Sequence, residues 1–76
     1  MPLAPQPSPQ RDVARNVRSQ RRALHLSQQK LAEEARISRR TLIAIESGDA
    51  NVSLNTLSAL AAVLGVPLEA LVAREK

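Results

Sequence analysis

The sequence has 76 residues, room for one small domain, and contains no cysteine and no Phe, Tyr or Trp. These absences exclude a disulfide framework and a thiolate metal site, and they require an aliphatic core, which favours helices over sheets. The net charge is +4, and nine of the eleven Lys and Arg residues lie between positions 10 and 46 beside four of the seven acidic residues. This basic half indicates either a polyanionic partner or a solvated arginine surface.

The N-terminal stretch MPLAPQPSP, residues 1–9, contains four prolines and no charged residue. Proline removes backbone donors and disfavours helix in the preceding residue, so we expect a disordered tail, or alternatively an extended proline-rich ligand. A helix is predicted from about Gln10 to Leu24, because Val13, Val17 and Leu24 share one stripe at helical spacing. The folded domain is expected over residues 10–73, followed by a short tail at 74–76.

Serine and glycine mark the ends of three further predicted helices. Ser27, Ser38 and Ser53 are plausible N-caps, and Gly48 and Gly65 are stop signals. A fifth short helix is expected with Pro67 in its first turn. The positions expected to face the core are Leu31, Ala32, Ala35, Leu42, Ile45, Leu57, Leu60, Ala61 and Leu64. The predicted fold is all-α, a compact bundle of about five short helices.

The second and third predicted helices are joined by a very short turn, residues 35–37, which ends at Ser38. Two helices so joined, each with one apolar face, form a helix-turn-helix. Arg39 and Arg40 are then the first exposed residues of the third helix, where the positive end of the helix dipole disfavours arginine. Binding to DNA would explain the two arginines, because the start of the second helix of a helix-turn-helix enters the major groove, where arginine donates two hydrogen bonds to guanine.

The predicted recognition helix, about residues 38–47, offers further candidates for DNA contact. Ala44 lies one turn after the arginines on the same face, and Thr41 lies at its side, within reach of the backbone or a thymine methyl group. Ile43 is expected to be partly exposed and to pack either on a thymine methyl group or on a neighbouring helix. The predicted base-reading residues are Ser38, Arg39, Arg40, Ile43 and Ala44.

The run LSQQKLAEEARISRRTLIAIESG, followed by SLNTLSALAAVLGVPLEAL, resembles the phage-repressor/Xre helix-turn-helix family, the lambda-repressor-like DNA-binding domains. The resemblance covers about residues 11–73. Its motif elements are Ser27-Gln28, Leu31-Ala32, Ile37-Ser38, Glu46-x-Gly48 and Gly65-Val66-Pro67. It implies homodimers that bind pseudo-palindromic double-stranded operators, and therefore a sequence-specific transcriptional regulator, a repressor or controller.

The resemblance also implies roles for single residues. Gln28 matches a glutamine that contacts a phosphate, and the base-reading positions of the family match Arg39, Arg40 and Ala44. Glu46 matches a glutamate that pairs with a first-helix arginine, here Arg21; the pair is either an exposed ion pair or a device that holds Arg21 toward a phosphate. The predicted phosphate-binding residues are Ser27, Gln28, Arg21, Thr41 and Asn51.

Two positions depart from the family pattern. The family usually has glycine in the turn, where this sequence has Arg36, and glycine commonly ends the first helix, where this sequence has His25. A non-glycine residue in the left-handed conformation costs of order 1 kcal/mol, so we expect a small loss of stability and an intact fold.

The last helix carries an apolar stripe, Leu68, Leu71 and Val72, beyond what one small core needs. Short helices are marginal in water, so this helix must pack on its own core or on a twin. A twofold dimer through it would place two recognition helices about 34 Å apart, one turn of DNA.

Two other functions remain open at this point: an antitoxin that neutralises a toxin, and the DNA-binding part of a longer regulator with a sensor domain. An enzyme is not expected, because the sequence has no catalytic constellation and no glycine-rich loop, and the lone His25 makes no metal site. No cofactor is predicted. No apolar run reaches the roughly 18 residues of a membrane span, and no signal peptide is recognisable, so we expect a cytoplasmic protein.

Overall fold

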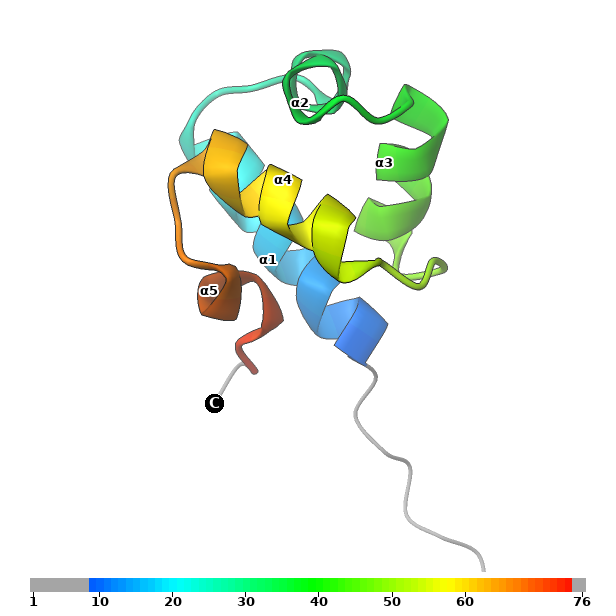
Figure 1. The fold of residues 1–76 in the computed structure, drawn as a ribbon, viewed down its shortest axis with the longest axis vertical. Coiled ribbons are helices and arrows are strands. Elements are labelled where there is room, and N and C mark those ends of the chain that lie inside the picture. Colours follow the sequence, from blue (N-terminus) through cyan, green and yellow to red (C-terminus); the bar gives the residue numbers. More distant parts are fainter. Residues whose placement is uncertain (1–8, 75–76) are drawn as a thin grey trace, which may run out of the picture.

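The computed structural model describes residues 9–74. Residues 1–8 of the tail predicted over 1–9, and residues 75–76 of the tail predicted over 74–76, lie outside this range. Its helices are α1 (Pro9–Ala23), α2 (Gln28–Ala35), α3 (Arg39–Ser47), α4 (Leu54–Leu64) and α5 (Leu68–Val72), arranged as in Figure 1. Residues 9–74 contain no strand, so the predicted all-α bundle of five short helices is confirmed.

Helix starts and stops follow the predicted serines and glycines. The side-chain oxygens of Ser27, Ser38 and Ser53 each accept a hydrogen bond from the backbone N–H three residues later, at 2.9, 3.0 and 3.1 Å. Gly48 and Gly65 end α3 and α4 with φ of 82° and 70°. Both glycines are left-handed, the conformation that ends a helix by turning its last N–H groups back onto free carbonyls.

Helix α1 is the element around which the others assemble. It contacts α3, α4 and α5, whereas α2 packs on α3 and α4. Figure 1 shows α4 crossing in front of α1, with α2 above them and α5 below. The largest fully buried side chains are all aliphatic and come from all five helices: Val17, Leu31, Leu42, Ile45, Leu60 and Leu71. This shared core fixes α3 relative to α2.

Helix α1 differs from its predicted bounds at both ends. It begins at Pro9, one residue inside the predicted tail, because a first helical turn tolerates a missing N–H. It ends one residue before Leu24, which was expected on the apolar stripe and is instead 48% exposed. The chain turns at His25, with a φ of 56°, and this turn takes Leu24 away from the stripe that Val13 and Val17 form.

Helix α5 is five residues long and is held at its C-terminal end by α1. The Asn16 amide nitrogen donates to the carbonyl oxygens of Leu71 and Ala73, at 3.0 and 2.8 Å, and Arg15 Nη2 donates to the Ala73 carbonyl at 2.8 Å. These donors satisfy carbonyls that the helix leaves without partners. Pro67 differs from its prediction, since it stands immediately before α5 rather than in its first turn.

The apolar stripe of α5 is divided between the core and the surface. Leu71 is fully buried within the single chain, so its predicted place at a dimer interface is wrong: the side chain has no surface left for a partner. Leu68 is half-buried against the core, and Val72 is 44% exposed. Of the predicted interface, Val72 and part of Leu68 are available to a second molecule.

Candidate nucleic-acid interface

The turn between α2 and α3 closes without glycine. Arg36 adopts the left-handed conformation, with φ 60° and ψ 41°, and its backbone N–H donates to the carbonyls of Ala32 and Glu33. The Ile37 N–H also donates to the Ala32 carbonyl, at 3.0 Å, and the Ile37 side chain packs against the core. Arg36 and His25 are therefore both left-handed, as the sequence predicts.

The first turn of α3 is ordered by a pair of hydroxyl groups. Ser38 Oγ accepts from the Thr41 backbone N–H at 3.0 Å and donates its own proton to Thr41 Oγ1 at 2.7 Å. Because this bond takes the serine proton, the threonine hydroxyl keeps its proton for an acceptor outside the chain. Phosphate oxygens are such acceptors. The structure gives Ser38 a capping role, and its contact with a base stays a prediction.

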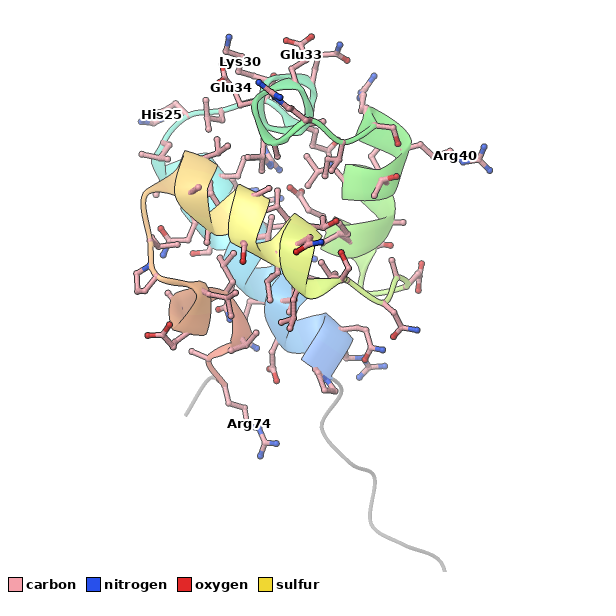
Figure 2. The ribbon with its side chains drawn as sticks, viewed as in Figure 1. His25, Lys30, Glu33, Glu34, Arg40 and Arg74 are labelled. Carbon is pink, nitrogen blue, oxygen red and sulfur yellow. The ribbon has the colours of Figure 1, made fainter. Side chains whose placement is uncertain are left out.

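Arg39 and Arg40 are exposed at the start of α3. Neither side chain forms an ion pair or a hydrogen bond within residues 9–74, and Figure 2 shows Arg40 extending away from the body of the protein. Further along the same helix, Ile43 is 43% exposed, as expected, and Ala44 is half-buried. The N-terminal half of α3 thus presents two uncompensated guanidinium groups and an aliphatic side chain to solvent.

Behind this surface, Arg21 of α1 and Glu46 of α3 form a buried ion pair. Nε and Nη2 of Arg21 donate to the two carboxylate oxygens of Glu46 at 2.8 and 3.0 Å, and the side chains are only 12% and 3% exposed. The predicted pairing is confirmed, and the alternative of an exposed ion pair is wrong. Nη1 of Arg21 donates to the Leu26 carbonyl at 2.9 Å, so each guanidinium nitrogen already has a partner inside the protein.

Two further donors reach Glu46 that the sequence analysis did not anticipate. Gln28, the first residue of α2, donates from its side-chain amide to Glu46 Oε1 at 3.2 Å. Arg18 donates from Nη1 to the backbone carbonyl of Glu46. The signal for Arg18 was present: it lies three residues before Arg21 and therefore on the same side of α1. The Gln28 contact joins α2 to α3 across the turn. The spacing of the two residues in the sequence does not predict this contact.

The remaining predicted phosphate ligands lie at the edges of this surface. The hydroxyl oxygen of Ser27 is used as the α2 cap. Asn51 is exposed in the loop between α3 and α4, where its Oδ1 accepts a hydrogen bond from the Gln10 amide of α1. Within residues 9–74, no three His, Asp or Glu side chains are grouped to hold a metal ion. No helix of that range is long and apolar enough to span a membrane.

Comparison with known proteins bears on this arrangement directly. Residues 17–71 match the model of the helix-turn-helix family HTH_3. The chain belongs to this helix-turn-helix family. It therefore carries a DNA-binding domain of the transcription-regulator class, and the resemblance found in the sequence is confirmed.

The proteins similar to this helix-turn-helix domain include two regulators and, in fold alone, part of an enzyme. The immunity repressor protein of Bacillus phage phi105 is 40% identical over 63 residues, which are 83% of this chain and 44% of the repressor. The restriction-modification controller protein C.AhdI from Aeromonas hydrophila is 31% identical, with a TM-score of 0.79 over 82% of this chain and 94% of the controller. Hydroxypropylphosphonic acid epoxidase from S. wedmorenis is 23% identical, with a TM-score of 0.80 over 90% of this chain and 36% of the enzyme, a likeness of fold alone.

Proposed function

We propose that this protein is a sequence-specific double-stranded DNA-binding regulator of transcription, a repressor or controller, whose recognition helix, residues 38–47, enters the major groove. The observation that carries the proposal is the exposed Arg39–Arg40 pair at the start of α3, which has no ion-pair partner within residues 9–74. An unpaired arginine is free to donate two hydrogen bonds to guanine O6 and N7.

The surroundings of the pair fit contacts with the DNA backbone. Thr41 is exposed and its hydroxyl accepts from Ser38, so its own proton is not used in that bond. Gln28 begins α2, whose first N–H groups have no partner inside the helix. Backbone N–H groups at a helix start bind phosphate. Gln28, Thr41, Ser27 and Asn51 are the proposed phosphate contacts. Arg21 is a further proposed phosphate contact, because three of its five guanidinium N–H groups donate inside the protein and the other two are left for a phosphate.

The relatives support this role, because one is named as an immunity repressor and another as a restriction-modification controller. We further propose a homodimer through the exposed part of α5, around Val72 and Leu68, that binds a pseudo-palindromic operator in the cytoplasm. In this role the protein has no catalytic activity of its own.

A second candidate is supported by the lengths of the relatives. The chain spans less than half, 44%, of the phage repressor that it matches. It therefore also fits the DNA-binding part of a longer regulator that carries a sensor domain.

Selection of binding sites from a pool of random duplexes tests the proposal. The expected product is a guanine-containing half-site repeated in inverted order at a spacing of about one DNA turn, ~10 base pairs. If repeated selection enriches no sequence, sequence-specific recognition is refuted.

A further inference from the structure

The side-chain amide of Gln28 has a defined orientation before any partner arrives. Its Nε2 lies 3.2 Å from Glu46 Oε1. A carboxylate only accepts hydrogen bonds, so the amide must turn its NH2 group, and not its carbonyl oxygen, toward Glu46. One of the two amide hydrogens is used in this contact. The other is left for an acceptor outside the protein.

The carboxylate that holds Gln28 is itself held firmly. Glu46 is 3% exposed, and both of its oxygens accept from Arg21, which also donates to the Leu26 carbonyl. Arg18 binds the Glu46 backbone carbonyl. Glu46 therefore sits in a frame built from α1, α3 and the loop before α2, and a side chain bonded to it is held in the same frame.

The charge of the carboxylate is balanced where it stands. An unpaired carboxylate beside a DNA phosphate would repel it, but the Arg21 guanidinium lies against Glu46 with bonds of 2.8 and 3.0 Å. The ion pair is neutral as a unit and presents no net charge to the DNA. Glu46 is thus able to direct Gln28 without opposing the partner of Gln28.

We propose that Glu46 is a positioning residue for DNA binding: through its Oε1 it fixes the Gln28 amide so that the second amide hydrogen is donated to a phosphate oxygen of the DNA backbone. This inference rests on the proposed function. Without Glu46 the amide rotates freely, and one of its orientations turns the carbonyl oxygen toward the phosphate. Because Glu46 holds the amide, that unfavourable orientation is avoided, and the entropy cost of ordering a long side chain does not fall on DNA binding.

A double-mutant cycle with a charge-neutral replacement tests the proposal. The replacement R21M/E46L removes the ion pair as a unit, which is often neutral or stabilising, whereas removing one partner leaves a buried charge. Binding is measured on a mixed-sequence duplex of about 30 base pairs, close to three helical turns, because a phosphate contact does not depend on sequence. Circular dichroism and thermal unfolding establish that each variant is folded.

The cycle has a definite expected result. Q28A and R21M/E46L each weaken binding about 3- to 10-fold, the range for one hydrogen bond, and the triple variant binds no more weakly than R21M/E46L. The matched control is Gln29→Ala, since Gln29 is the next residue of α2 and its amide bonds Glu33, an exposed carboxylate, at 2.9 Å. We expect Gln29→Ala to change the affinity less than twofold.

Several results would overturn the positioning role. If Q28A costs its full factor in the R21M/E46L background, Glu46 does not act through Gln28. If Q28A alone has no effect while the wild type binds DNA, Gln28 donates to no phosphate. A wild type that binds neither this duplex nor any duplex recovered by site selection refutes the proposed function instead.

A second measurement keeps the proposal testable if R21M/E46L does not fold. In the free wild-type protein, NMR relaxation of the side-chain amides should show Gln28 Nε2 more ordered than Gln29 Nε2, with little change for Gln28 when the duplex is added. Equal mobility of the two amides in the free protein would contradict the inference.

Discussion

Replacing Arg36 with glycine should stabilise the protein. Arg36 is left-handed at φ 60° and ψ 41°, its side chain is exposed, and it forms no ion pair or side-chain hydrogen bond within residues 9–74. A left-handed non-glycine residue costs about 1–2 kcal/mol. Replacement by glycine removes this strain, but glycine also has more conformational freedom in the unfolded chain, which offsets about 0.4–1 kcal/mol of the added stability. The net expectation is about 0.5–1 kcal/mol of added stability.

This gain corresponds to a rise of about 2–8 °C in Tm, since 1 kcal/mol shifts a domain of this size by about 4–8 °C. Thermal unfolding followed by circular dichroism measures it. Gly65 supplies the reciprocal experiment: its φ is 70°, and a Cβ atom placed there meets nothing within 4 Å, so the replacement G65R adds the strain without a clash. We expect G65R to lower Tm by a similar amount and the pair R36G/G65R to leave it nearly unchanged. A lower Tm for R36G would refute the strain argument.

Further predictions concern DNA binding and assembly. Alanine at Arg39 or Arg40 should cost about 1–3 kcal/mol on the selected site and relax the preference at one base position, whereas equal losses on selected and random duplexes would make the arginine a phosphate contact. The logarithm of the binding constant should fall with the logarithm of salt concentration at a slope of about −0.9 per neutralised phosphate, and a flat dependence would point to a protein as the main partner. V72E should weaken binding to a duplex with two half-sites without loss of fold, and sedimentation that finds single copies bound, with no gain from the second half-site, would refute the dimer. L71A should instead lower the free energy of unfolding by about 2–5 kcal/mol, because Leu71 is a fully buried core residue.

Local sequence signals located the helices well. Ser27, Ser38 and Ser53 cap the helices that they were predicted to begin, because a serine hydroxyl satisfies an N–H of the first turn whatever the tertiary context. Gly48 and Gly65 end theirs for a similar local reason. These rules depend on a few adjacent residues, and such rules can be read from the sequence.

Tertiary contacts were harder to anticipate. Leu71 was assigned to a dimer interface because periodicity shows that a residue lies on an apolar stripe but not which body covers it; α1 and the rest of the core cover it here. The prediction for Leu24 was wrong for a different reason: the left-handed turn at His25 ends α1 at Ala23, one residue before Leu24. The burial of Arg21 and Glu46, and the bond from Gln28, depend on how three separate segments meet.

The most direct test of the central claim is to find which groove α3 occupies. Guanine N7 faces the major groove and adenine N3 faces the minor groove, so methylation of these atoms before binding distinguishes the two. The duplex recovered by site selection is methylated sparsely, and bound and free molecules are compared. We predict that methyl groups on guanine N7 within each half-site block binding and that methyl groups on adenine N3 at A·T pairs of the same half-sites do not. Interference confined to adenine N3, or none at guanine N7, would contradict a recognition helix in the major groove.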